Sequence, residues 1–133
     1  MQPESWNGGC LCGSCRYTVS GKPSHVGYCH CSMCRRATGG PFAVLVRVEG
    51  QIVEWSRVPA SYRSSPIATR GFCPTCGTPL YLQYDGDSRI RLLVGTVDQP
   101  DSFVPQSHYG VEGRLKWIDC NAGLPEEETT ETW

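Results

Sequence analysis

The order of apolar and polar residues along the chain predicts short strands. Cys15, Tyr17 and Val19 alternate with polar residues, as in a strand that buries one face. Further strands are predicted where β-branched, aliphatic and aromatic residues gather, at residues 42–48, 52–55, 80–84 and 89–97. The last two flank the turn sequence Asp-Gly-Asp-Ser at residues 85–88, which predicts a hairpin.

Helix is predicted over a single short segment, residues 32–38. Ser32 is a suitable N-cap and Gly39 a suitable stop, which allows one or two helical turns. Ten prolines and 15 glycines divide the rest of the chain into short pieces. The pattern therefore predicts a mainly β fold with little helix.

The length of 133 residues corresponds to one domain. The sequence after Pro125 differs from the rest, because EEETTET offers no aliphatic residue to bury before Trp133. We predict one domain over residues 1–125 and an acidic, solvated tail over residues 126–133.

Charge and hydropathy exclude several classes of function. Twelve Lys and Arg against 13 Asp and Glu give a net charge of -1, which is not the basic footprint of a nucleic-acid binder. No apolar run approaches the ~18 residues that a membrane span needs. The opening MQPESWNGGC does not resemble a signal peptide. We expect a soluble cytoplasmic protein without nucleic-acid or membrane partners, and its oligomeric state does not follow from the sequence.

Nine cysteines stand out in a chain that is sparse in Leu, Ile and Val. Three clusters follow in order and leave Cys120 alone: Cys10, Cys12 and Cys15; Cys29, Cys31 and Cys34; Cys73 and Cys76. A disulfide between such near neighbours closes almost no loop, whereas close spacing is what chelation of one ion requires. The spacing, in a reducing compartment, favours metal binding over a disulfide framework.

The CxxC pair at Cys73 and Cys76 is typical of a zinc knuckle, in which Gly77 takes a positive φ and backbone amides face the sulfurs. A structural zinc needs four ligands, so a second pair must come from elsewhere. Cys10 and Cys12 are the best candidates, because two residues apart in an extended segment their side chains face the same way.

Cys29, Cys31 and Cys34 then form a local triad, and their function depends on Cys15. Three protein ligands and an open fourth position are typical of catalytic zinc, whereas four ligands are typical of structural zinc. If Cys15 completes the triad, the chain carries two closed four-cysteine sites. If it does not, the second zinc is open to a substrate. The spacing leaves these two options close to even.

Three cysteine-containing segments resemble the glutathione-dependent formaldehyde-activating enzyme family, which includes the centromere protein V type: residues 8–13 (GGCLCG), 29–36 (CHCSMCRR) and 70–78 (RGFCPTCGT). Residues 95–98 (GTVD), 105–108 (PQSH), 116–117 (KW) and 123–125 (GLP) are similar to its C-terminal half, so the resemblance covers residues 6–125. It implies a β-tent fold of short antiparallel sheets, shared with B-type methionine sulfoxide reductases and Rab-binding zinc proteins.

The resemblance also implies ligands and an activity. It implies two zinc ions per chain, a structural one on Cys10, Cys12, Cys73 and Cys76 and a catalytic one on Cys29, Cys31 and Cys34. Cys15 falls at a position that is not a ligand in the family. The implied reaction is the condensation of glutathione, or a similar thiol, with formaldehyde to S-hydroxymethylglutathione, a carbon–sulfur lyase activity. A zinc ion held by three thiolates suits a thiol substrate better than it suits hydroxide generation.

Other polar residues carry weaker expectations. Arg35 and Arg36 follow the triad and are candidates to bind the carboxylates of the thiol substrate, and Arg70 is a candidate neighbour of a negatively charged zinc site. His30 is expected to point away from the metal by alternation, His108 to be a buried histidine with a partner, and Cys120 to be a buried free thiol.

Two other functions remain open at this point. One is a non-catalytic zinc module with two four-cysteine sites that binds a protein or a small molecule. The other is methionine sulfoxide reduction, which ranks last because neither Cys15 nor Cys120 has a recognisable catalytic context.

Overall fold

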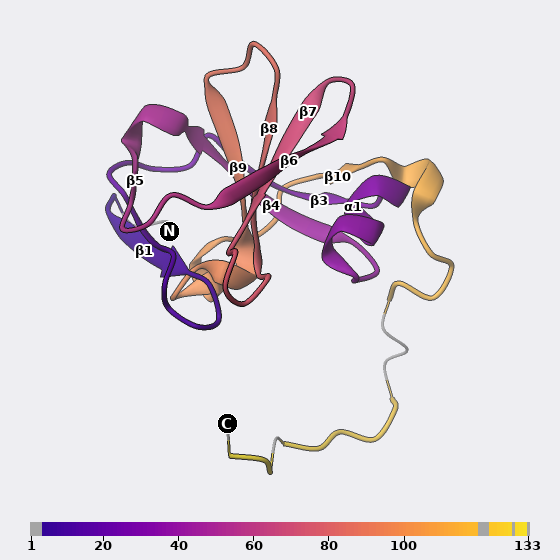
Figure 1. Cartoon of the computed structure of the whole chain (residues 1–133). Coiled ribbons are helices and arrows are strands. Elements are labelled where there is room, and N and C mark those ends of the chain that lie inside the picture. The colour runs from indigo at the N-terminus through magenta and orange to yellow at the C-terminus, as the bar shows by residue number, and fades with distance from the viewer. Residues whose placement is uncertain (1–3, 120–122, 129, 133) are drawn as a thin grey trace.

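The computed structural model describes residues 4–119, 123–128 and 130–132, and these form a mainly β protein with little helix, as predicted. Ten strands and one α-helix are present in this part of the chain (Figure 1). The strands are β1 Trp6–Gly9, β2 Arg16–Val19, β3 His25–Cys29, β4 Ala43–Glu49, β5 Val53–Trp55, β6 Ala60–Ser65, β7 Ala68–Phe72, β8 Pro79–Tyr84, β9 Arg89–Leu93 and β10 His108–Tyr109.

The strands form two sheets. The smaller sheet has the order β1-β2-β5, and the larger has the order β10-β3-β4-β9-β8-β7-β6. Neighbouring strands pair antiparallel except β3 and β10, whose two-residue pairing is parallel. A bridge between Gly8 and Val97 connects the smaller sheet to the segment that follows β9.

The helix α1 spans Ser32–Thr38, as predicted, and Gly39 ends it with a φ of 74°. The predicted N-cap is wrong by one residue. Cys31, not Ser32, has extended backbone and accepts a hydrogen bond from the Cys34 amide on its sulfur. The cap is a sulfur because the chain passes directly from β3 into the helix, which places Ser32 already in the first turn.

Strand prediction succeeded where aliphatic residues alternate and failed elsewhere. The hairpin between β8 and β9 is confirmed, but β9 ends at Leu93, because the Thr96 hydroxyl donates to the Leu93 carbonyl and closes a 3₁₀ turn at Val94–Thr96. Five strands lack that signal, since Gly, Ser, His or Arg interrupt them: β1, β3, β6, β7 and β10. Three further 3₁₀ helices span Gly50–Ile52, Pro100–Ser102 and Val111–Gly113.

The core lies where the two sheets face each other. Its largest fully buried side chains include Tyr17, Leu80 and Leu92, and the rings of Trp6 and Phe103 close one end with centroids 4.6 Å apart. The predicted alternation in β2 is confirmed, because Tyr17 and Val19 are buried while Arg16 and Thr18 are half exposed. The core is built mainly from β-branched residues and from aromatic rings.

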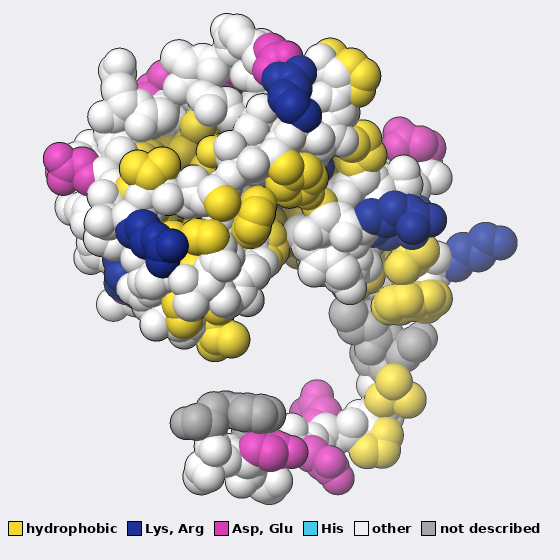
Figure 2. Space-filling model, viewed as in Figure 1, with side chains coloured by type: hydrophobic (Ala, Val, Ile, Leu, Met, Phe, Trp, Pro, Cys, Tyr) yellow, Lys and Arg dark blue, Asp and Glu magenta, His cyan; other side chains and the backbone are white. Residues whose placement is uncertain are grey.

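Beyond the last 3₁₀ helix the described residues form little regular structure. Residues 123–128 are exposed and form neither strand nor helix, and acidic side chains gather on this end of the chain (Figure 2). The division into a domain over 1–125 and a tail over 126–133 stays a prediction, and Cys120 lies outside the described residues. In the part of the chain that is described, no helix has the length and apolar character that crossing a membrane requires.

Candidate metal centres

Cys10, Cys12, Cys73 and Cys76 form the first cluster, in which the four sulfurs lie within 4.8 Å of one another. The sulfur of Cys12 lies 3.6 Å from that of Cys10 and 3.8 Å from that of Cys73. Four tetrahedral bonds of about 2.3 Å to one zinc ion place the sulfurs about 3.8 Å apart. The donor atoms and their spacing therefore fit a four-coordinate zinc.

Two similar turns build this cluster. The first does not have the extended backbone that the sequence suggested: the Gly13 amide donates to the Cys10 carbonyl, and Gly13 has a φ of 84°. The second is the predicted knuckle, in which Gly77 has a φ of 80° and the Cys76 amide donates to the Cys73 sulfur. The sulfurs of Cys10 and Cys12 are thus brought together by a tight turn and not by an extended segment.

Hydroxyl groups favour the thiolate form of this cluster. A hydrogen bond from Ser14, whose oxygen is 3.2 Å from the Cys73 sulfur, lowers the pKa of Cys73 to about 5. A hydrogen bond from Thr78 likewise lowers the pKa of Cys76 to about 7. A metal ion binds the thiolate, so both sulfurs are prepared for it.

Cys15 packs beside the first cluster and not beside the triad. It is fully buried, its amide donates to the Cys10 sulfur at 3.2 Å, and burial raises its pKa. The cluster of cysteines that includes Cys29 contains three sulfurs among the described residues, and Cys15 is not one of them. The described structure therefore does not bring together two four-cysteine sites.

Cys29, Cys31 and Cys34 form the second cluster at the point where β3 passes into α1. Cys29 is the last residue of β3, Cys31 caps the helix, and Cys34 lies in its first turn. The Cys29 and Cys31 sulfurs are 3.4 Å apart, and all three sulfurs lie within 4.8 Å of one another. Three soft donors at this spacing fit a metal ion such as zinc with one position left for another ligand.

Arg70 on β7 supplies positive charge to this cluster. It is 7% exposed, and its Nη2 donates to the Cys34 sulfur at 3.6 Å. A hydrogen bond from Cys29 and then the Arg70 guanidinium lower the pKa of Cys34 to about 5, while the pKa of Cys29 is raised. The cluster is therefore built to hold negative charge at Cys34, and Arg70 is the neighbour that the sequence suggested.

Two histidines lie behind the triad without joining it. His30 is buried and its Nε2 lies 2.8 Å from Nδ1 of His108, so its ring turns away from the cysteines as expected. The expectation of a buried His108 is wrong, because this ring lies on the exposed edge strand β10 and stacks on Tyr28 at 4.6 Å. An edge strand exposes its side chains, and alternation along the sequence does not reveal which strand is at the edge.

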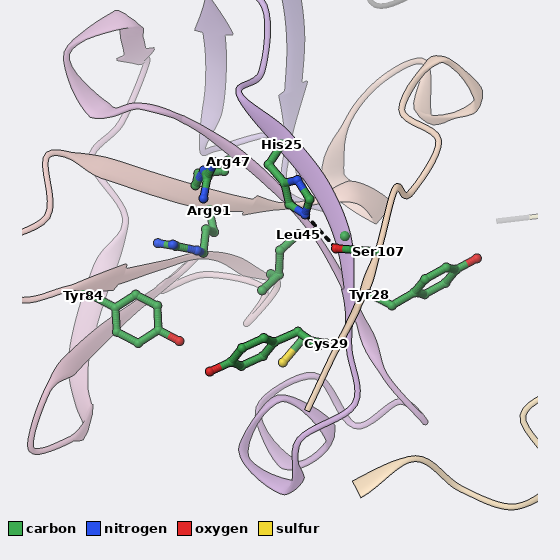
Figure 3. Close-up of a pocket in the computed structure, with 10 residues that line it drawn as sticks. His25, Tyr28, Cys29, Leu45, Arg47, Tyr84, Arg91 and Ser107 are labelled. Carbon is green, nitrogen blue, oxygen red and sulfur yellow. Dashed lines mark hydrogen bonds between the residues drawn. The ribbon is translucent and has the colours of Figure 1, made fainter. Parts of the chain in front are cut away.

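A cavity of about 310 Å³ reaches the triad at Cys29. Figure 3 shows the Cys29 sulfur at one end, the guanidinium groups of Arg47 and Arg91 at the other, and Leu45 between them. The lining residues are His25, Gly27, Tyr28, Cys29, Leu45, Arg47, Tyr84, Arg91, Ser107 and Tyr109. The cavity therefore joins a cluster of sulfur donors to a pair of cations.

Arg35 and Arg36, the predicted carboxylate ligands, are not among the residues that line this cavity. Arg35 is half-buried and Arg36 is exposed on α1. Sequence reasoning missed Arg47 and Arg91, although both interrupt predicted strands between buried aliphatic neighbours. This alternation could have shown that Arg47 and Arg91 lie on the face of the sheet opposite the core. The sequence does not show that their two strands are neighbours.

Comparisons with known proteins identify a family, a relative and a shared fold. The family model described as "Glutathione-dependent formaldehyde-activating enzyme" matches residues 5–112. A relative from Schizosaccharomyces pombe, named an uncharacterised lyase, is 33% identical over 82 residues, which cover 62% of this chain and 59% of the relative. The crystal structure of a Rhodobacter sphaeroides protein superposes with a TM-score of 0.60 at 21% identity, covering 77% of this chain and 98% of the other, which shows a shared fold.

Proposed function

The chain belongs to the glutathione-dependent formaldehyde-activating enzyme family, and from this premise we propose that it is a zinc-dependent carbon–sulfur lyase. Its reaction would form or cleave a thiol–aldehyde adduct such as S-hydroxymethylglutathione. The observation that supports this most directly is the triad of sulfurs at one end of a cavity wide enough for a small molecule. The lyase name of the yeast relative agrees with the reaction class.

We assign the two clusters different roles. Cys10, Cys12, Cys73 and Cys76 would hold a structural zinc, because four donors leave no position for a substrate. Cys29, Cys31 and Cys34 would hold a catalytic zinc, because the described residues offer three donors beside a cavity. The chemistry that zinc supplies in such a site is the binding of a thiol in its deprotonated form.

The reaction is a condensation without oxidation or reduction. The thiol sulfur forms a bond to the aldehyde carbon, the π pair of the carbonyl moves to its oxygen, and the thiol proton ends on that oxygen. Arg70 would stabilise the negative charge of Cys34, since its guanidinium is buried against that sulfur. Cys29 lies on the cavity wall, so a substrate entering the cavity meets the triad there.

The alternative, a binding module with two closed four-cysteine sites, requires a fourth donor at the triad. Cys15, the residue proposed for that position, is held at the first cluster by its hydrogen bond to Cys10. This observation favours the enzyme over the module. Arg35 and Arg36 stay candidates for contacts with substrate outside the cavity.

Exchange between formaldehyde and glutathione, followed by NMR with ¹³C-formaldehyde, tests the proposal. Wild-type protein should accelerate adduct formation, and Cys34→Ser should lose that acceleration and one zinc ion while it keeps the fold. Cys76→Ser should lose the fold, because a structural zinc contributes on the order of 10 kcal/mol in small domains. Equal unfolding of both variants, or full activity of Cys34→Ser, would reject a catalytic triad.

Cobalt substitution tests the contact between thiol and metal. Addition of glutathione to the cobalt protein should strengthen the thiolate-to-cobalt absorption band, whereas S-methylglutathione should leave it unchanged. An unchanged band with glutathione would show that the thiol does not bind the metal.

A further inference from the structure

We propose that Arg47 and Arg91 form a carboxylate-binding subsite at the end of the cavity remote from the triad, and that this subsite selects thiols that carry a carboxylate. The inference rests on the proposed function for the position of the sulfur, at Cys29. The subsite itself rests on five features of the cavity: paired cations, a lining without acids, the fixed position of Arg91, a wall packed against Gly27 and a matching length.

Arg47 and Arg91 are direct neighbours across two strands. They are partners in the register of β4 and β9, so their side chains lie on one face of the sheet. Like charges in opposed positions repel each other unless an anion lies between them. Burial, and then the charges of Arg89 and Arg91, lower the pKa of Arg47, which shows the same repulsion. The pair therefore favours a bound anion.

The surrounding acids neutralise this pair only in part, because Asp87 pairs with Arg91 and leaves Arg47 without an acidic partner. Asp87 accepts hydrogen bonds from the Arg89 side chain at 2.9 and 3.2 Å, and it accepts a longer one of 3.5 Å from Nη1 of Arg91, with which it forms an ion pair. Arg47 donates its Nε to the Ser24 hydroxyl at 3.0 Å and has no ion-pair partner among the described residues. Among the described residues no Asp or Glu lines the cavity, so the guanidinium nitrogens that face it have only a ligand or water as a partner there.

Arg91 is also held in place for such a contact. Its guanidinium lies over the Tyr84 ring, 4.8 Å from the centroid, and its side chain is 17% exposed. A cation held by the Tyr84 ring and by an ion pair with Asp87 loses little conformational freedom when it binds a further anion. Bidentate contacts from arginine to carboxylate are among the strongest charge-assisted hydrogen bonds.

Gly27 lets the side chains of His25 and Ser107 pack closely against β3, where they form one wall of the cavity. A Cβ at this position would lie 2.9 Å from Nε2 of His25 and 3.1 Å from the hydroxyl of Ser107, which are hydrogen-bonded to each other at 2.9 Å. Figure 3 shows this pair beside the arginines. A side chain at Gly27 would therefore displace the wall of the cavity. Glycine in the middle of a strand is typical of a close approach by another group.

The length of the cavity fits a small peptide thiol. Arg47 is the cross-strand partner of His25, which precedes Cys29 by four residues, and four residues of a strand span about 13 Å. An extended peptide of three residues spans about 10 Å. Because arginine side chains are long and the two spans are similar, a di- or tripeptide thiol can place its sulfur at Cys29 and its carboxylate at the pair.

Binding of S-methylglutathione by calorimetry tests the subsite without the thiol. Wild-type protein should bind it, and its diester should bind at least ~10-fold more weakly, since a hydrogen bond to a charged group is worth about 1.5 kcal/mol or more. The double variant Arg47→Gln, Arg91→Gln should bind S-methylglutathione more weakly than the wild type by the same factor. The single variant Arg47→Lys should lose less affinity. Arg63→Gln is the matched control, because it removes a surface charge paired with Asp85 outside the cavity.

The outcomes separate the subsite from the proposed function. Arginine-dependent binding of S-methylglutathione without any turnover of glutathione would support the subsite and reject the lyase. Two results would overturn the subsite and leave the lyase, provided that the wild type turns over glutathione. The double variant could bind S-methylglutathione as tightly as the wild type, or the wild type could fail to bind it. If both hold, the double variant should lose at least ~10-fold more kcat/KM with glutathione than with 2-mercaptoethanol. Circular dichroism and zinc content should match the wild type.

Discussion

Nη2 of Arg70 lies 3.6 Å from the sulfur of Cys34, and both side chains are buried. Within the described residues no carboxylate lies within ion-pair distance of Arg70, and its Nε has no hydrogen-bond partner. A buried cation without a counter-ion is strongly destabilising. The thiolates of the triad therefore supply the negative charge that balances Arg70. Because Arg70 lies on β7, the charge of the triad contributes to the stability of that strand.

Replacement of Arg70 should weaken metal binding at the triad. Arg70→Met keeps the bulk of the side chain and removes the charge, so we expect zinc affinity to fall at least ~10-fold, because a charged partner of the thiolate is lost. Arg70→Lys should recover part of the loss. Competition with a chromophoric chelator measures the zinc affinity of each variant. Unchanged affinity in Arg70→Met, compared with the surface control Arg63→Met, would show that Arg70 has no electrostatic role at the triad.

Cys15→Ala should keep the zinc content of the wild type. Cys15 is fully buried but is not among the clustered sulfurs, so the expected cost is the packing loss of one small atom, about 1 kcal/mol. Cys12→Ala, by contrast, should lose the ion of the first cluster and unfold. Elemental analysis and urea unfolding measure both effects. Loss of a zinc ion in Cys15→Ala would identify Cys15 as a ligand.

Gly8→Ala should destabilise the smaller sheet. A Cβ at Gly8 would overlap the ring of Tyr17 and the carbonyl of Thr96. The side-chain hydroxyls of these two residues are joined by a buried hydrogen bond of 2.9 Å. Overpacking of this kind costs about 1–3 kcal/mol. Gly95→Ala is the control, because Gly95 is exposed, has no atom within 4 Å of the added Cβ and lies in a 3₁₀ turn. Urea unfolding measures the stability of both variants. Equal destabilisation of Gly8→Ala and Gly95→Ala would contradict this packing.

The contribution of Asp87 to stability should disappear in acid. Hydrogen bonds from Arg89 hold the pKa of Asp87 well below its usual range, so the stabilisation is complete above the unfolded pKa of about 3.9 and is lost as the pH falls through the folded pKa. Asp87→Asn should therefore be less stable than wild type at pH 7, and the difference should shrink below about pH 4.

Urea unfolding at pH 7, 5 and 3 measures this difference. Protonation of the cysteines affects wild type and variant alike and cancels between them. Asp101→Asn serves as the control, because Asp101 is exposed and makes no ion pair in the described part of the structure. A constant difference from pH 7 to pH 3 would contradict the role of the Asp87 charge.

Local features of this protein could be predicted from its sequence, and features that depend on strand order could not. The knuckle at Gly77, the helix stop at Gly39 and the buried face of β2 follow from residues within one turn or strand. The carboxylate-binding pair and the exposed ring of His108 depend on which strands are neighbours and which lies at the edge. Side-chain alternation assigns a face to a residue, but it does not assign the strand beside it.

The two cysteine clusters also differ in the length of chain that each one closes. The triad lies within residues 29–34, whereas 61 positions separate Cys12 from Cys73 in the first cluster. For flexible loops this difference corresponds to about 2 kcal/mol of additional closure entropy. The triad can therefore gather its sulfurs early and locally during folding, while the first cluster can form only when strands from both halves of the chain have met. Loop closure thus favours formation of the local triad before the first cluster, whose sulfurs come from distant parts of the chain.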